Sequence, residues 1–382
     1  MVTSADVNVF TNISALGVKI KGVGCSGTVP AMRRSTAAAF ICTAVLHLVT
    51  VQGDTLADIG QLLPPWITGN LEELVRAASD SCEVLPLDVL FSKVYGPDID
   101  VVEFRRHKRK SFSLSKAHLH LRDRLPQTLV IYVPGWWNTP TDESSKTLVK
   151  ALLNKNPSVL VLDTRLIFCK GYVASTAGVN GLALRLYKFI KNMTNDGLPL
   201  SSVHLIGFSL GAHVVAITGK LVQKHLHRKL DKITALDPAR PCFSRQSEYR
   251  LEKSDAKFVL VIHTNAGVLG LEQPLGHVDV YANGVLTKQP ECQDRSISLQ
   301  CDHAQAWRLF AASVIDDHVL VGRRCKSWEE LNSGQCSGNE TVVGYSCNTN
   351  TRGMFLYKSP VEKKEPELRV FNPLDLFTWW IQ

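Results

Sequence analysis

Three residue types in this 382-residue chain could together cleave an ester: a serine, an aspartate and a histidine. Ser209 lies in "GFSLG" (207–211), where a glycine on either side permits the sharp turn that exposes a nucleophile. A serine hydroxyl needs a base to take its proton and a carboxylate to orient that base. Asp237 ends the run "KITALD" directly before a proline, and His303 lies between Cys301 and the helical "AWRLFAASV". Ser209, Asp237 and His303 are therefore candidates for nucleophile, orienting acid and base.

The residues alone leave all three of these roles open. Asp302 is a poor partner for His303, because neighbouring side chains diverge. Ser209 could also be no more than the cap of a helix that follows a strand. The alternative carboxylates and bases are Asp163, Asp279, Asp302, His263 and His277.

Short apolar runs closed by Gly, Pro or polar residues are the elements that would position these groups, and they are typical of buried parallel strands. The runs are 128–133, 158–163, 203–208, 232–237 and 257–264. Between them, 175–193 and 211–230 have helical spacing. Alternating strands and helices predict an α/β fold with a mostly parallel central sheet and helices on both faces. The ligand crevice of such a sheet lies at the carboxyl ends of its strands. After about residue 320, the Cys- and Gly-rich sequence predicts irregular structure.

The composition is that of an ordinary globular protein, with 45% apolar and 20% charged residues. A net charge of +8 is too moderate to indicate nucleic-acid binding, and we expect none. The densest basic run is "RRHKRK", Arg105 to Lys110. It could be a solvated loop, a dibasic processing site, or a contact for an anionic surface such as phospholipid headgroups or acidic glycans.

The N-terminal region predicts secretion. Residues 32–53 hold two arginines, an apolar run from Ala37 to Val51 and small residues, the order of a secretory signal. A signal anchor is the alternative. We therefore expect residues 1–53 to be an extension with the signal, 54–110 a lead-in segment packed on the main domain, and 111–382 the catalytic domain. The protein would be secreted and extracellular.

The cysteines agree with an oxidising compartment. The spacings of Cys292 to Cys301 and of Cys325 to Cys336 suit disulfides that staple local loops. The pairing of four further cysteines, Cys82, Cys169, Cys242 and Cys347, is left open. No cysteine or histidine pattern indicates zinc, so no metal site is expected. Asn192 and Asn339 begin N-x-Thr patterns that secretory glycosylation could use.

Five blocks, in this order, resemble the animal neutral lipase family, the pancreatic-lipase-like group: "HLIGFSLGAHV", "ITALDPARPCF", "SDAKFVLVIHT", "GHVDVYANG…QPEC" and "CDHAQAWRLFAASV". The resemblance covers about residues 128–345 and includes secreted insect lipases and venom-type phospholipases A1. It implies an α/β-hydrolase fold with Ser209 as nucleophile, Asp237 as orienting acid and His303 as base. It also implies disulfides Cys292–Cys301 and Cys325–Cys336.

The same resemblance implies an oxyanion hole made by the backbone N–H groups of Leu210 and Trp136. Leu210 also suits this role on its own, because it would begin a helix after the serine. The chain departs from the family at Pro134, which replaces the usual histidine before Gly135 in "VPGWWN". Proline fixes the local φ angle and removes an N–H, so it constrains the geometry of this loop.

The family's lid lies between cysteines that match Cys292 and Cys301, which here enclose only "QDRSISLQ". So short and polar a lid resembles the phospholipase A1 branch. Only 79 residues (382 − 303) follow His303, so we expect no C-terminal β-sandwich and no colipase partner. The resemblance thus implies a serine esterase, a triacylglycerol lipase or phospholipase A1, acting without a cofactor at a membrane or lipid-droplet surface. A non-catalytic lipid-binding or yolk-type storage protein on the same fold is the alternative.

Overall fold

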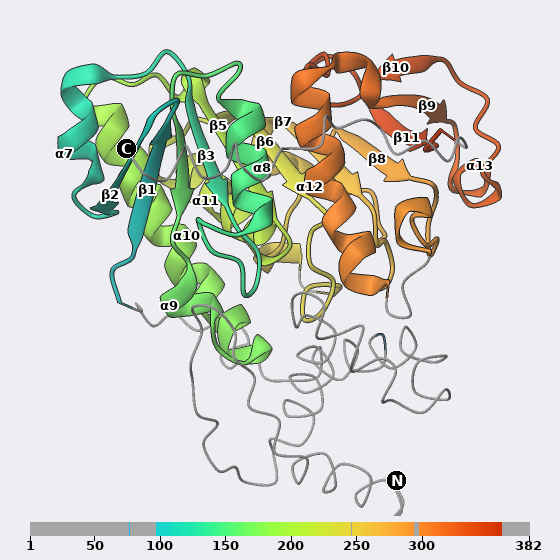
Figure 1. Cartoon of the computed structure of the whole chain (residues 1–382), viewed down its shortest axis with the longest axis horizontal. Helices are drawn as coiled ribbons and strands as arrows, with labels where there is room; N and C mark the ends of the chain where they lie inside the picture. The colour runs from blue at the N-terminus through green and yellow to red at the C-terminus, as the bar shows by residue number, and fades with distance from the viewer. Residues whose placement is uncertain (1–75, 77–96, 246, 294–297, 361–382) are drawn as a thin grey trace, which may run out of the picture.

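One sheet of eleven strands organises the part of the chain that the computed structural model describes, namely residue 76 and residues 97–245, 247–293 and 298–360 (Figure 1). In chain order the strands are β1 (Asp100–Arg105), β2 (Lys108–Ser113), β3 (Leu129–Val133), β4 (Val159–Leu162), β5 (Val203–Phe208), β6 (Leu230–Leu236), β7 (Ala256–His263), β8 (Val278–Ala282), β9 (Val321–Cys325), β10 (Glu340–Val342) and β11 (Gly353–Tyr357). Their order across the sheet is β10-β9-β11-β8-β7-β6-β5-β3-β4-β1-β2. The strands from β11 to β4 in this order are parallel, and the two strands at each edge are antiparallel.

Helices connect the strands and cover both faces of the sheet (Figure 1). They are α7 (Ala117–Leu121), α8 (Glu143–Leu152), α9 (Arg165–Phe168), α10 (Tyr172–Asn195), α11 (Leu210–Leu226), α12 (Leu299–Ile315) and α13 (Trp328–Ser333). Short 3-10 turns are η3 (Arg122–Arg124), η4 (Leu200–Ser202), η5 (Ser247–Tyr249), η6 (Lys253–Asp255), η7 (Pro290–Cys292) and η8 (Asp317–Val319). None of the helices in the described part of the chain combines the length and apolarity that crossing a membrane requires.

Strand β3 shows why both faces of the sheet need cover. Its side chains alternate, so Ile131 packs into the core beneath α10 and α11, while Tyr132 packs into the core beneath α8 and α12. Both residues are fully buried. A strand buried on both sides reads as a continuous apolar run, which is the pattern that predicted it. The predicted α/β-hydrolase class, with a mostly parallel sheet between two helical layers, is confirmed.

The prediction of irregular structure after residue 320 is wrong. This section contains β9, β10, β11 and α13, and β11 lies beside β8 as a parallel member of the sheet. The strands were not recognised because β9 and β10 are short and polar: "VGRRC" and "ETV" have no apolar run. β9 is positioned by pairing with β11, and β10 by pairing with β9.

The N-terminal expectations fall mostly outside the described residues, including the division at residue 53, the signal at 32–53 and the lead-in from 54 to 96. Strand pairing crosses the expected boundary between residues 110 and 111. β2 spans Lys108–Ser113, and β1 pairs with both β2 and β4. Strands β1 and β2 therefore belong to the same sheet as β3 to β8.

Candidate active site

Ser209 lies in the turn between β5 and α11, at the carboxyl end of the sheet. Its φ of 54° is in the left-handed region, which side chains other than glycine adopt only at a cost. The glycines on either side of Ser209 cannot be replaced, because a side chain at either position would collide with the backbone. A Cβ on Gly207 would lie 2.4 Å from the Gly211 carbonyl oxygen, and one on Gly211 would lie 2.1 Å from that of Val133. The Ser209 N–H donates to the Leu236 carbonyl at 3.0 Å, which ties the turn to β6.

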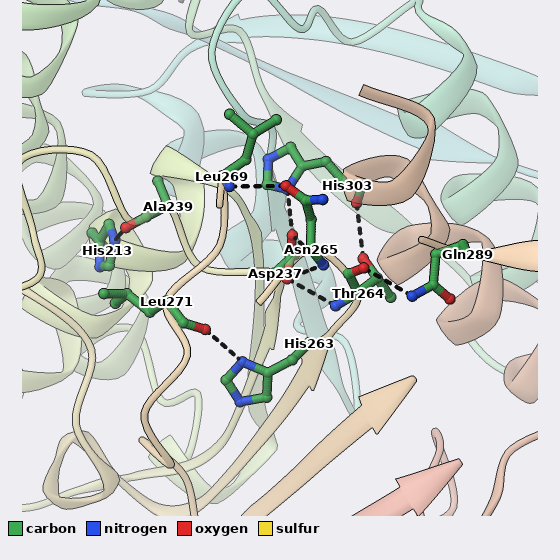
Figure 2. Close-up of polar contacts among 10 residues, drawn as sticks. All are labelled: His213, Asp237, Ala239, His263, Thr264, Asn265, Leu269, Leu271, Gln289 and His303. Carbon is green, nitrogen blue, oxygen red and sulfur yellow. Dashed lines mark hydrogen bonds and ion pairs between the residues drawn. The ribbon is translucent and has the colours of Figure 1, made fainter. Parts of the chain in front are cut away.

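Asp237 follows β6 directly and is fully buried. Its Oδ1 accepts the backbone N–H groups of Thr264, at 2.9 Å, and of Asn265, at 3.1 Å. Its Oδ2 accepts from His303 Nδ1 at 2.5 Å. Figure 2 shows the carboxylate between these groups. Gly270 packs so closely that a Cβ there would lie 2.4 Å from Oδ1. The buried charge is thus balanced by donors on three sides.

His303 lies in the first turns of α12, with only 9% of its surface exposed. Because Nδ1 donates to Asp237, the neutral ring keeps its lone pair on Nε2, which is the form a general base requires. The ring packs against Phe208, with centroids 4.6 Å apart, and this brings it beside the residue before Ser209. Among the described residues no hydrogen bond joins Ser209 to His303. Catalytic hydrogen bonds commonly tighten only when substrate is bound.

The competing carboxylates are engaged elsewhere. Asp302 accepts the Gln289 N–H at 2.8 Å. Asp163 forms an ion pair with Arg165, whose Nε lies 2.8 Å from Oδ1. Asp237 is the candidate that hydrogen-bonds the His303 ring.

The competing histidines are also occupied. His263 Nε2 lies 3.0 Å from Asp279 Oδ1, so an alternative base pairs with an alternative acid away from Ser209. His277 Nδ1 accepts the Val259 N–H at 3.0 Å, beside the amino end of β8.

The loop after β3 lies directly against Ser209. A Cβ on Gly135 would lie 2.9 Å from Ser209 Cβ, so this glycine permits close approach of the Pro134-Gly135-Trp136 backbone. Leu210 is the first residue of α11, so its N–H has no acceptor within the helix. The two backbone segments expected to form an oxyanion hole therefore flank Ser209.

Two indoles anchor this loop. Trp136 Nε1 donates to the Lys170 carbonyl at 2.9 Å, and Trp137 Nε1 reaches the same oxygen at 3.4 Å. The Trp137 N–H donates to the Phe168 carbonyl at 3.3 Å. The Trp136 ring also meets Tyr172 edge-on, with centroids 5.0 Å apart. Contacts with the segment after β4 thus fix the loop that contains Pro134.

His213, one turn after Ser209, is a residue that sequence reasoning missed. Its Nε2–H donates to the Ala239 carbonyl at 2.8 Å, and its Nδ1 accepts the Leu251 N–H at 3.3 Å. The ring stacks on Phe243 with centroids 3.9 Å apart. Burial lowers the pKa of His213 to about 3, so the ring is neutral at physiological pH. It ties α11 to the segment after Asp237. The only signal in the sequence was its place in the "GFSLGAH" block.

A disulfide joins Cys292 to Cys301, two residues before His303 in α12. A second joins Cys325 to Cys336. Cys169 and Cys242 are each disulfide-bonded as well, while Cys347 is a buried free thiol. Cys82 lies outside the described residues.

The remaining candidate positions differ in accessibility. Asn339 is exposed beside β10, whereas Asn192 is half-buried in α10 with its amide 3.5 Å from His118 Nδ1.

In the described ranges, no group of three or more His, Cys, Asp or Glu side chains could hold a metal ion.

Comparison with known proteins places this chain in a family. The family model described as Lipase matches residues 110–371. "Lipase member H-B" of Xenopus laevis is 36% identical over 200 residues, which are 51% of this chain and 42% of the relative. "Phospholipase A1 member A" of Bos taurus is 37% identical over 170 residues, 43% of this chain and 36% of the relative. The chain spans about half the length of the curated relatives it matches, or less.

Solved structures with a similar arrangement are more distant. A phospholipase/carboxylesterase from Dyadobacter fermentans aligns with 74% of this chain and 99% of its own, at 10% identity and a TM-score of 0.33. An esterase from Pyrobaculum calidifontis aligns with 70% of this chain and 99% of its own, at 14% identity and a TM-score of 0.32. The family assignment rests on the sequence match, which covers more than half of the chain and confirms the resemblance of the five blocks. The chain belongs to the lipase family.

Proposed function

We propose that this protein is a serine hydrolase that cleaves carboxylic esters of lipids, with Ser209, Asp237 and His303 as its catalytic triad. The observation that carries the proposal is the 2.5 Å contact between His303 Nδ1 and the buried Asp237 carboxylate, beside a serine in a nucleophile elbow. Membership of the lipase family supports the lipid ester as substrate. The non-catalytic storage or binding protein has no structural observation in its favour.

In the proposed mechanism, His303 Nε2 takes the proton from Ser209 as Oγ attacks the ester carbonyl carbon. The N–H groups of Leu210 and Trp136 stabilise the oxyanion that forms. His303 then gives its proton to the leaving alkoxide, and an acyl-enzyme remains. Water, deprotonated by the same imidazole, attacks the acyl group, and the collapse of the second tetrahedral intermediate returns the proton to Ser209. Asp237 holds the ring in one tautomer and balances the imidazolium charge.

The short lid bears on the substrate. Eight residues separate Cys292 from Cys301, and the disulfide between these cysteines holds the two ends together. So short a segment can cover little of an acyl-binding surface, which favours direct access for a phospholipid over a wide, lid-covered cleft. The relatives include proteins named as a lipase and as a phospholipase A1, so triacylglycerol and phospholipid remain the two substrates to compare.

The deciding experiment is fluorophosphonate labelling of the secreted protein, with Ser209→Ala as the control. Labelling that disappears in the variant is expected. No labelling of the unaltered protein would favour the binding-protein alternative, and labelling that persists in the variant would contradict Ser209 as the nucleophile. A second assay compares triacylglycerol emulsion with phosphatidylcholine vesicles and resolves release from the sn-1 and sn-2 positions. Preference for long-chain triacylglycerol would contradict the argument from the short lid.

The disulfides support folding in an oxidising compartment and thus secretion, with the exposed Asn339 as the better-placed of the two glycosylation sites. The basic run Arg105 to Lys110 spans the end of β1, the turn at residues 106–107 and the start of β2. Phe104 pairs with Val159, the first residue of β4, so this turn lies at the amino end of the parallel strands. An anionic partner bound there would occupy the opposite end of the sheet from the lipid substrate.

A further inference from the structure

We propose that His263 and Asp279 are a positioning pair, which closes the segment 264–271 into a cradle for the carboxylate of Asp237. This inference rests on the proposed function, because a position for Asp237 matters to activity only if the triad works. Neither residue contacts the reacting atoms. Their effect is transmitted through the backbone of the segment between β7 and β8.

The pair itself is completely enclosed. His263 is 0% exposed and Asp279 2% exposed. His263 Nδ1 lies 2.9 Å from the Leu271 carbonyl oxygen, and Nε2 lies 3.0 Å from Asp279 Oδ1. The imidazole also stacks on Tyr281, with centroids 4.3 Å apart and planes within 5° of parallel. The ring therefore has one fixed orientation.

These contacts orient the ring. A carbonyl oxygen only accepts, so Nδ1 carries a hydrogen that points at Leu271. On the other side, Nε2 faces Asp279 Oδ1, which also accepts the N–H groups of Leu275, at 2.8 Å, and Gly276, at 3.1 Å. The backbone thus fixes the carboxyl group that holds the imidazole.

One imidazole thus ties together both ends of a short loop. His263 precedes Thr264 in the chain, and its side chain holds Leu271 at the other end (Figure 2). Within this closed segment, the N–H groups of Thr264 and Asn265 donate to Asp237. Gly270 packs against the same carboxylate.

The segment has a second connection to the region of Asp237. The Leu271 N–H donates to the carbonyl of Pro238, the residue after Asp237, at 2.8 Å. The Leu271 carbonyl is therefore held by the His263 imidazole, and the Leu271 amide is held by Pro238, next to Asp237. If the imidazole releases Leu271, the amides that face Asp237 lose the constraint that sets their direction.

Two substitutions at residue 279 remove different numbers of these hydrogen bonds. In Asp279→Asn, the amide oxygen at the Oδ1 position can still accept from Leu275 and Gly276. His263 Nε2 faces the same atom, and a neutral imidazole has a single N–H, so it can donate to Leu271 or to the amide oxygen but not to both. Asp279→Ala removes the partner and the two backbone contacts. His204→Gln is the matched control, since His204 is also buried in the sheet and bonds Thr234 at 2.9 Å, near the amino end of β5.

The expected result for Asp279→Ala is a fall in kcat on a soluble ester of about 10- to 100-fold, the scale of a small misplacement of a catalytic group, with KM nearly unchanged. Asp279→Asn should lose less kcat than Asp279→Ala, because it keeps the contacts to Leu275 and Gly276, and His204→Gln should keep kcat close to that of the unaltered protein. Amide hydrogen exchange gives a readout that needs no activity. The peptide containing Thr264 and Asn265 should exchange faster in Asp279→Ala than in the unaltered protein or in His204→Gln.

If Asp279→Ala does not fold, His263→Phe combined with Asp279→Asn replaces it, because this double variant cuts the bond to Leu271 without leaving a buried charge. A folded variant of either kind with unchanged kcat and unchanged exchange at Thr264 and Asn265 would overturn the proposal. A protein that lacks Ser209-dependent activity would overturn the proposed function instead. Exchange would then still decide whether the pair holds the cradle.

Discussion

His303 Nδ1 donates to Asp237 Oδ2 over 2.5 Å, while the other carboxylate oxygen accepts the amide N–H groups of Thr264 and Asn265. The acid is thus fixed by the backbone before it orients the base. Its geometry depends on β6, on the start of the β7–β8 segment and on α12. Changes in any of these three should be detectable as changes in kcat.

Asp237→Asn should lower kcat by about 10⁴-fold, because an amide can donate to Nδ1 and so favour the wrong imidazole tautomer. KM should change little, since the residue does not contact substrate. Steady-state kinetics on a soluble ester test this, with the urea midpoint as a control for folding. A loss of less than tenfold would show that another carboxylate can orient His303.

Gly135→Ala should lower kcat by about 100- to 1,000-fold, the effect of losing one oxyanion donor. The added Cβ would lie 2.9 Å from Ser209 Cβ, so the loop that carries the Trp136 N–H must move away. Because the ground-state ester needs this donor less than the oxyanion does, KM should change little. Wild-type kcat in this variant would place the oxyanion donor elsewhere.

Replacing both Cys292 and Cys301 by alanine should destabilise the protein by about 2–3 kcal/mol, the loop-closure effect for a disulfide over a separation of nine residues. The kcat per folded molecule should also fall, because Cys301 fixes the start of the helix that holds His303. The matched control replaces Cys325 and Cys336, whose separation is eleven residues. The control should lose similar stability and keep its kcat. Equal activity in the two double variants would contradict this role.

Acid should destabilise the protein through His213. Burial lowers the pKa of this ring to about 3 from 6.5, so between these values the unfolded chain binds a proton that the folded chain does not. The stability is present in full above pH 6.5 and is lost as the pH falls toward 3. By pH 5 the loss is about 2 kcal/mol. Urea midpoints from pH 7 to 5 should fall less steeply for His213→Gln than for His225→Gln, an exposed control. Parallel curves would show that His213 does not titrate in this way.

Charge removal at the β1–β2 turn should separate anion binding from catalysis. Arg106→Gln with Lys108→Gln should weaken sedimentation with anionic phospholipid vesicles and leave soluble-ester hydrolysis unchanged, because the turn lies at the other end of the sheet. Lys191→Gln with Lys224→Gln removes the same charge from exposed helix positions and should bind vesicles normally. Equal loss in both variants would indicate a general effect of net charge.

The sequence predicted the central strands well, because β3 to β7 are buried on both faces and read as unbroken apolar runs. The edge strands were not predicted. β2 is "KRKSFS", with four exposed positions in succession, and only its pairing with β1 makes it a strand. A polar edge strand has no apolar run by which its sequence could be recognised. Lysine at such an edge protects the strand from pairing with other chains.

Ser209, Asp237 and His303 could be chosen from their order and their sequence blocks. Their surroundings could not, because the groups that hold Asp237 are backbone amides, and any residue type has one. His263 illustrates the difference. The sequence marked it as an alternative base, whereas the structure pairs it with Asp279, itself an alternative acid. Sequence identified both as chemically capable, and only the fold separates them from the nucleophile.

The basic turn and the nucleophile lie at opposite ends of the same strands, and this has a consequence for orientation. A molecule bound to a polyanionic support through Arg105 to Lys110 would turn the carboxyl end of its strands, with Ser209, away from the support and toward the solution. Adsorption should then leave kcat on a soluble ester unchanged. One end of the sheet would bind the support while the other end stayed accessible to substrate.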